Sequence, residues 1–307
     1  CSALAKGVLT RSNTVHVCYC HTPTRYLWSD THQYVTDLPY PRWLKWGIRR
    51  MLTRLRQWDQ LAANRVDVFL ANSRNVAERI AKYYRRESEV VYPPVAVDRF
   101  RPVEQLGQYF LTGGRLVPYK RFDVVVTAFN RLSLPLHVFG EGPELPRLRA
   151  LAKPNVEFLG HLPQAALADC YARCLAFIQP QVEDFGITAI EAMAAGRPVI
   201  AFAAGGSMET VIAGQTGVLF DEQSWESLAD AVIRFAPERF RSADIRRHAE
   251  QFSVDRFRQR LATIVEGEWQ KLQGRRAPVH QIGDAIRDSR AVFTHSRGAP
   301  ADKKGQG

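Results

Sequence analysis

Two glutamates on either side of a glycine turn are the strongest candidates for ligand contacts in this sequence. Glu183 follows the apolar run at residues 175–178, and Glu191 lies on the second turn of a helix predicted to begin after Gly186. Free N–H groups at a helix N-terminus attract phosphate oxygens, and carboxylates accept hydrogen bonds from hydroxyl groups. The segment therefore predicts a ligand with both a diphosphate and hydroxyls, as in a nucleotide sugar.

Two cations follow another predicted strand, at residues 109–112. Arg115 and Lys120 lie between this strand and a helix predicted over residues 121–132. That connection reaches the carboxyl edge of a parallel sheet, where α/β proteins bind ligands. A guanidinium can donate to two phosphate oxygens, and an ammonium adds a compact positive charge. Both groups are suited to stabilising a departing nucleoside diphosphate, and two solvated loop cations are the alternative.

The run from Glu183 to Glu191, with Gly196 and Pro198 after it, resembles the signature of the retaining GT-B glycosyltransferases of family four. The resemblance implies that Glu183 contacts the transferred sugar and that Glu191 holds the ribose. It also implies that Arg115 and Lys120 contact the phosphates. It further implies that the donor is surrounded by Phe185, Gly186, Ile187 and Thr188. The alternative is a surface helix with two solvated acids.

Two further glycine turns resemble parts of the family's nucleotide site. The first lies beside the nucleotide and the second receives the base, and their residues are Gly140, Glu141, Leu159 and Gly160. A glycine turn between a strand and a helix is often only a connection, so both interpretations stay open. No Asp-x-Asp pair occurs in the chain to hold a divalent ion on the diphosphate. Neither a metal nor another cofactor is expected, since Arg115 and Lys120 can take the ion's place.

The acceptor site is predicted in the N-terminal part. His21 follows a strand predicted over residues 15–20 and should face the cleft between two domains. In similar transferases a histidine at this place lies near the transferred sugar, which makes His21 a catalytic candidate beside Glu183, Arg115 and Lys120. The resemblance also allows an acceptor site lined by Arg25, Tyr26 and Trp28. A structural histidine at a strand end is the alternative.

Residues 41–58 predict a basic amphipathic helix. It carries no acid and six basic residues, which are Arg42, Lys45, Arg49, Arg50, Arg54 and Arg56. One helical face collects Leu44, Ile48, Met51, Leu52 and Leu55. Such a helix can lie on an anionic membrane surface, which would suit a lipid-linked acceptor. It can equally pack its apolar face on the sheet and leave its basic face solvated.

Strand and helix signals alternate along the chain, which predicts an α/β fold. The resemblance makes this fold the GT-B type, with two doubly wound, Rossmann-like domains. We expect an acceptor-side domain at residues 1–102, a donor-binding domain with closing helices at 103–272, and a disordered basic tail at 273–307. The first domain is expected to be incomplete, because the chain starts without Met and only one strand signal precedes His21.

Composition agrees with a globular enzyme. The 307 residues are 46% hydrophobic, and no run approaches the roughly 18 apolar residues of a membrane span. We therefore expect a cytoplasmic protein, peripheral on the inner face of the cell membrane if residues 41–58 bind lipid. The formal net charge of +11 suits phosphorylated ligands or anionic membranes. Nucleic acid is not expected, because helix-turn-helix signals and an aromatic base platform are missing.

The expected reaction moves a sugar, with retention, from a nucleotide sugar to a saccharide or lipid-linked saccharide. The run from His21 to Tyr26 resembles mannosyltransferases of surface polysaccharide synthesis, which favours GDP-mannose as the donor. A GT-B nucleotide-sugar epimerase is the first alternative, and it would release a rearranged sugar without an acceptor. A noncatalytic nucleic-acid-binding protein is the second, and its binding would depend steeply on salt.

Overall fold

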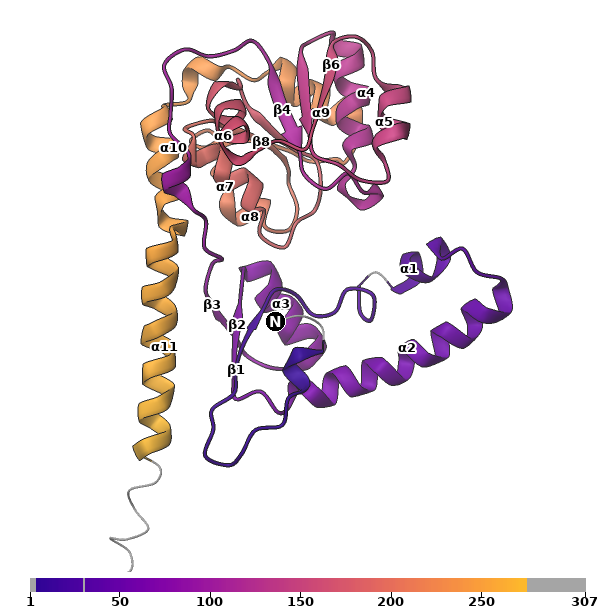
Figure 1. Cartoon of the computed structure of the whole chain (residues 1–307), viewed down its shortest axis with the longest axis vertical. Coiled ribbons are helices and arrows are strands. Elements are labelled where there is room, and N and C mark those ends of the chain that lie inside the picture. The colour runs from indigo at the N-terminus through magenta and orange to yellow at the C-terminus, as the bar shows by residue number, and fades with distance from the viewer. Residues whose placement is uncertain (1–3, 30, 275–307) are drawn as a thin grey trace, which may run out of the picture. The chain divides into compact units, whose positions relative to one another are not determined.

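The computed structural model describes residues 4–29 and 31–274 (Figure 1). Residues 4–9 and 16–261 form one compact unit, and the described residues 10–15 and 262–274 belong to a second. Both parallel sheets lie in the first unit. The second unit contains the later part of helix α11 (Val254–Gly274).

The N-terminal sheet is parallel, with the strand order β1-β2-β3 in the described residues. Its strands are β1 (Val17–Cys20), β2 (Val68–Ala71) and β3 (Glu89–Val90). The helical elements of this part are η1 (Ala5–Gly7), α1 (Thr31–Asp37), α2 (Arg42–Ala63) and α3 (Arg74–Tyr84). Helix α3 begins where Ser73 caps it, because the Ser73 hydroxyl accepts from the Val76 N–H.

The second sheet is parallel and has six strands, in the order β6-β5-β4-β7-β8-β9. The strands are β4 (Phe110–Gly113), β5 (Leu136–Phe139), β6 (Val156–Gly160), β7 (Phe177–Gln179), β8 (Val199–Phe202) and β9 (Gly217–Phe220). The chain therefore winds outward from β4 in one direction and from β7 in the other. The neighbouring strands β4 and β7 form the topological switch point, where doubly wound sheets bind ligands.

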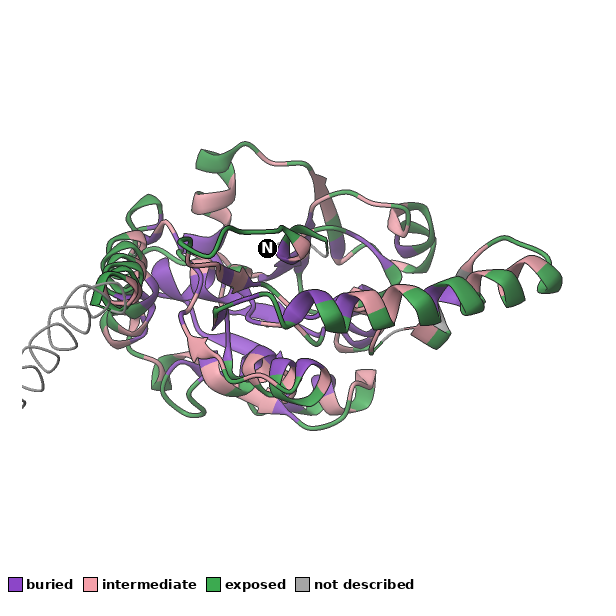
Figure 2. Ribbon diagram, turned by 90° about the horizontal axis from the view of Figure 1, so that it is seen from below, coloured by how far each residue is buried: buried purple, intermediate pink, exposed green. Residues whose placement is uncertain are grey.

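Helices cover both faces of the six-stranded sheet. Leu111 and Phe177 belong to a buried cluster with α6 (Gln164–Arg173), α7 (Ile187–Ala194) and α10 (Ser242–Ala249). Their neighbours Phe110 and Ile178 belong to a second buried cluster with α4 (Phe122–Leu132) and α9 (Trp225–Ile233). This alternation explains the nearly continuous apolar strands, which are buried on both sides (Figure 2).

The remaining helical elements are α5 (Leu145–Leu151), α8 (Ser207–Thr210), η2 (Val97–Arg99), η3 (Pro118–Lys120), η4 (Pro237–Arg239) and η5 (Glu250–Phe252). The predicted α/β fold with parallel sheets is confirmed, and the predicted boundary near residue 102 stays a prediction. Helix α11 continues to Gly274, and the predicted disorder of the tail from residue 273 stays a prediction. Residues 275–307 lie outside the described residues. Within the described ranges, no helix combines the length and apolarity needed to cross a bilayer.

Candidate active site

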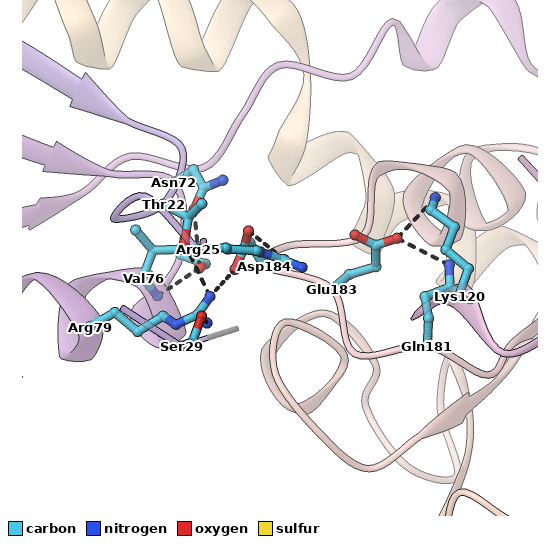
Figure 3. A network of polar contacts seen from close by, with 11 residues as sticks. Thr22, Arg25, Ser29, Asn72, Val76, Arg79, Lys120, Gln181, Glu183 and Asp184 are labelled. Carbon is cyan, nitrogen blue, oxygen red and sulfur yellow. Dashed lines mark hydrogen bonds and ion pairs between the residues drawn. The ribbon is translucent and has the colours of Figure 1, made fainter. Parts of the chain in front are cut away.

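The loops that follow β4 and β7 bring two predicted catalytic residues together. Helix α4 packs on one face of the sheet and α7 on the other, so the two loops diverge at the switch point. Lys120 ends the turn η3 after β4, and Glu183 lies in the loop after β7. The Nζ atom of Lys120 lies 3.1 Å from Oε1 of Glu183 (Figure 3). A cation and a carboxylate from neighbouring strands thus meet where a ligand is expected.

One oxygen of the Glu183 carboxylate is held from two sides. Besides Lys120, the Gln181 Nε2–H donates to Oε1 over 3.2 Å. The Gln181 side chain is buried, and the Lys120 and Glu183 side chains are 15% and 21% exposed. In the described part of the chain, Oε2 of Glu183 has no hydrogen-bond donor. This oxygen can accept from a hydroxyl group without breaking an existing contact.

The turn between β7 and α7 has the geometry that the sequence predicts. Gly186 adopts a φ of +93°, a left-handed conformation that favours glycine, and its carbonyl accepts from the Ala189 N–H at 3.1 Å. The first-turn N–H groups of Ile187 and Thr188 have no partner within the helix. Phe185 turns inward and contacts Tyr92 and Phe252. The loop is thus anchored by a buried ring while a helix N-terminus opens beside Glu183.

Glu191 lies in a different environment from Glu183. Its Oε2 accepts from the hydroxyl of Tyr171, at 3.2 Å, and the Tyr171 side chain is fully buried. Burial raises the pKa of Glu191, and the Tyr171 hydrogen bond partly opposes that shift. The ribose-binding role of Glu191 stays a prediction.

Backbone hydrogen bonds join the loops after β4, β5 and β6. The Gly140 N–H donates to the Gly160 carbonyl at 2.7 Å, and the Gly114 N–H donates to the Phe139 carbonyl at 3.1 Å. The Leu116 N–H donates to the Glu141 carbonyl at 2.8 Å. These turns support the loop that carries Arg115 and Lys120. Nucleotide contacts for Gly140, Glu141, Leu159 and Gly160 stay predictions.

Arg115 is exposed, and its guanidinium makes no ion pair with the described residues. His21 is exposed at the end of β1, with its ring centre 5.3 Å from that of Tyr19. Although the residue is exposed as a whole, partial burial of the imidazole lowers the pKa of His21, and the Asp184 carboxylate opposes this. His21 is therefore neutral at pH 7, with one ring N–H to donate.

The three residues predicted to line an acceptor site do not gather at one place. Arg25 Nη2 lies 2.7 Å from Oδ2 of Asp184 (Figure 3). Trp28 turns away, because its Nε1–H donates to the buried Asp59 carboxylate at 2.8 Å. Tyr26 is partly buried beside a small apolar cluster that contains Leu27, Val35 and Leu52. Their contact with an acceptor stays a prediction.

Sequence reasoning missed two acidic residues beside these loops. Asp184 pairs with Arg25 and also with Arg79 of α3, at 2.7 Å in each case. Glu209 of α8 accepts from the N–H groups of Arg74 and Asn75, at 2.9 and 3.3 Å. Their places in the chain offered a weak signal, since Asp184 follows Glu183 directly and Glu209 follows a glycine pair. Their partners lie far away in the sequence, so local patterns do not reveal them.

Family models match most of the described chain. The model for glycosyl transferases group 1 matches residues 98–252, and the model for glycosyltransferase family 4 matches residues 1–99. A D-inositol 3-phosphate glycosyltransferase from Streptomyces avermitilis is 31% identical over 234 residues, which cover 62% of this chain and 49% of the relative. A GDP-mannose-dependent alpha-(1-6)-phosphatidylinositol monomannoside mannosyltransferase from Mycobacterium tuberculosis is 34% identical over 184 residues, covering 50% and 48%. The chain spans about half the length of these relatives.

Solved structures share the fold. Anabaena Alr3699/HepE in complex with UDP superposes with a TM-score of 0.66 at 19% identity, covering 83% of this chain and 72% of that chain. Sucrose-phosphate synthase from Thermosynechococcus elongatus superposes with a TM-score of 0.65 at 22% identity, covering 71% and 62%. These likenesses confirm the predicted GT-B fold.

Proposed function

Because the chain belongs to the group 1 glycosyltransferases, we propose that the whole protein is an enzyme that transfers a sugar from a nucleotide-sugar donor. The contact between Lys120 and Glu183 carries this proposal. It puts a cation suited to a diphosphate beside a carboxylate suited to hydroxyls, at the switch point of the sheet. The N-terminus of α7 adds N–H donors next to them.

The proposed reaction proceeds with retention. As the anomeric bond opens, negative charge grows on the diphosphate, where Arg115, Lys120 and the first turn of α7 stabilise it. The Oε2 atom of Glu183 accepts from sugar hydroxyls and orients the ring. The departing diphosphate acts as the base for the acceptor hydroxyl, and His21 donates a hydrogen bond on the acceptor side. We assign no covalent nucleophile, and the cations replace a metal ion.

We propose GDP-mannose as the donor and a saccharide or lipid-linked saccharide of surface polysaccharide synthesis as the acceptor. The names of relatives support the donor, because the Mycobacterium tuberculosis protein and a Mycolicibacterium smegmatis alpha-mannosyltransferase are both described as GDP-mannose-dependent. The second of these is 38% identical over 130 residues, which cover 42% of this chain and 34% of that relative.

We further propose that the enzyme works in the cytoplasm, at the inner face of the membrane, with α2 on anionic lipid. Most of the predicted apolar face of α2 packs inward, since Leu52 is buried and Ile48 and Leu55 pack beside it. Met51 is an exception to the predicted face, with 53% exposure. The exposed residues of α2 instead include Trp43 and Trp46, at 74% and 66% exposure, among its basic residues. Exposed indoles among cations suit a lipid interface.

A donor panel tests the proposed function. The whole protein is incubated with GDP-mannose and with UDP- and ADP-sugars, with and without lipid-linked saccharide acceptors. We expect transfer only with an acceptor, and a loss of about 100-fold or more in kcat/KM for Glu183→Ala and Arg115→Ala. Lys82→Ala, which removes an exposed cation of α3, is the matched control and should retain activity.

Three other outcomes would contradict this proposal. Undiminished turnover in both site variants would reject the site, and a rearranged sugar released without acceptor would identify an epimerase. Salt-sensitive binding to DNA or RNA together with indifference to all nucleotide sugars would identify a nucleic-acid-binding protein.

A further inference from the structure

We propose that Asp184 is a positioning residue that holds the loop at residues 21–29 in a defined position relative to Glu183. The inference rests on the proposed function, because it concerns how His21 is placed relative to the donor sugar. Asp184 has no role in the signature that the sequence resembles. The contacts of the Asp184 carboxylate support this role.

Each oxygen of the Asp184 carboxylate binds a different guanidinium. Oδ2 lies 2.7 Å from Nη2 of Arg25, and Oδ1 lies 2.7 Å from Nη1 of Arg79. The three side chains are largely shielded from water, at 16% exposure for Asp184, 29% for Arg25 and 21% for Arg79. Charge-assisted hydrogen bonds of this length are stronger than neutral ones, and solvent screens them less here than on an open surface.

Arg79 extends the cluster to both ends of the loop at residues 21–29. Its Nη1–H donates to the Thr22 hydroxyl at 3.1 Å, and its Nη2–H donates to the Ser29 hydroxyl at 2.8 Å. Arg25, in the middle of the loop, reaches the same carboxylate (Figure 3). Asp184 therefore binds the loop directly through Arg25 and indirectly through Arg79.

The same backbone segment holds the donor-side carboxylate. Glu183 and Asp184 are consecutive, and Figure 3 shows their side chains directed to opposite sides, toward Lys120 and toward the two arginines. The Glu183 carbonyl accepts from the Gly206 N–H at 2.8 Å, which restrains the backbone between them. A displacement of the loop that carries His21 is thus transmitted to Glu183 through one peptide unit.

Removal of the Asp184 charge would weaken the contacts that Arg25 and Arg79 make with this carboxylate. Because both contacts bind the loop at residues 21–29, the loop should loosen. Arg115 and Lys120 make no contact with Asp184 in the described chain, so donor diphosphate binding should persist. The predicted defect therefore lies in transfer rather than in nucleotide binding.

Asp184→Asn and Asp184→Glu test this role, with Asp169→Asn as the matched control for an exposed aspartate–arginine pair on α6. We expect Asp184→Asn to lower the kcat of transfer by about 10–100-fold, since small misplacements of reacting groups have effects of this size. The Kd for GDP, measured by calorimetry, should stay within about twofold of wild type. Asp184→Glu should recover part of the lost kcat, and Asp169→Asn should behave like wild type.

Hydrogen–deuterium exchange gives a second measurement that does not depend on activity. Asp184→Asn should raise amide exchange in residues 21–29, and Asp169→Asn should not. If the wild-type protein transfers no sugar while this exchange effect appears, the proposed function fails and the positioning contact stands. Wild-type kcat together with unchanged exchange in Asp184→Asn would overturn the inference on Asp184 alone.

Discussion

At the scale of single residues, two glutamates eight positions apart have different chemistry because their surroundings differ. Glu183 is partly exposed and binds the Lys120 ammonium. Glu191 is mostly shielded and receives a hydrogen bond from Tyr171. Burial is the larger influence there and raises the pKa of Glu191. An ionised Glu191 therefore reduces the stability of the folded protein.

Glu191→Gln should consequently raise stability at neutral pH. With its pKa raised above the ordinary value of 4.5, Glu191 contributes fully to stability only while protonated, and that contribution is lost as pH rises through the raised pKa. Tm at pH 7 should rise by roughly 2–4 °C for each kcal/mol that the buried charge costs. The gain should vanish below pH 4.5. Thermal melts across pH measure this, with the exposed Glu104→Gln as control. A gain that grows toward acid pH would contradict the assignment.

The cations of the site lead to a prediction about metal removal. We proposed that Arg115 and Lys120 supply the positive charge that a divalent ion supplies in other transferases, and the chain lacks an Asp-x-Asp pair. Dialysis against excess EDTA should therefore leave kcat within about twofold of its original value, whereas Lys120→Met should lower it by about 100-fold. Loss of activity with EDTA and recovery with added Mg²⁺ or Mn²⁺ would show that the cations do not replace a metal.

At the scale of elements, α8 and the glycine pair before it determine where the Glu183 loop lies. Gly205 pairs with Glu183 in an isolated parallel bridge, and the Gly206 N–H donates to the Glu183 carbonyl. A Cβ atom on Gly206 would lie 2.5 Å from Cα of Phe185, a backbone atom that cannot rotate away. The two segments approach this closely only because residue 206 has no side chain.

Gly206→Ala should therefore displace the loop. We expect a loss of about 1–3 kcal/mol in the free energy of unfolding, as for other overpacked sites, and a parallel fall in kcat as Glu183 moves. Urea denaturation and initial rates measure the two effects. Gly47→Ala, in α2 with open space around the added methyl, should instead stabilise by about 0.5–1 kcal/mol. Equal behaviour of the two variants would show that the Gly206 contact is unimportant.

For the molecule as a whole, the net charge of +11 attracts the protein to negatively charged surfaces. Much of this charge lies on α2, where Arg49 and Arg50 are exposed beside the two outer tryptophans. The Arg50 guanidinium lies 5.9 Å from the Trp46 ring centre. The proposed contact with anionic lipid would use this surface, and the predicted donor residues lie on other elements.

Vesicle co-sedimentation tests this surface. The protein should bind vesicles that contain anionic phospholipid at low salt and should be released as salt increases. Arg49→Gln combined with Arg50→Gln should weaken partition by about 10–30-fold, at about 1 kcal/mol for each cation lost. Arg173→Gln, on the exposed side of α6, is the control. Binding that is equal in all variants, or equal on neutral vesicles, would reject the membrane role of α2.

Local sequence patterns predicted the α/β fold, the alternation of strands and helices, and the turn that presents Glu183 before α7. These features depend on local patterns, namely buried apolar runs, a glycine with positive φ and helical spacing. Arg115 and Lys120 were placed near the correct sheet edge for the same reason, because a residue after a parallel strand must lie at its carboxyl end.

Long-range packing determines which residues meet. Arg25 and Arg79 reach Asp184 across 159 and 105 positions of the chain, and the Trp28 indole N–H donates to Asp59. Strand order and helix packing determine such contacts, and no local pattern encodes them. The raised pKa of Glu191 has the same origin, because distant elements bury this carboxyl group and the sequence near it does not.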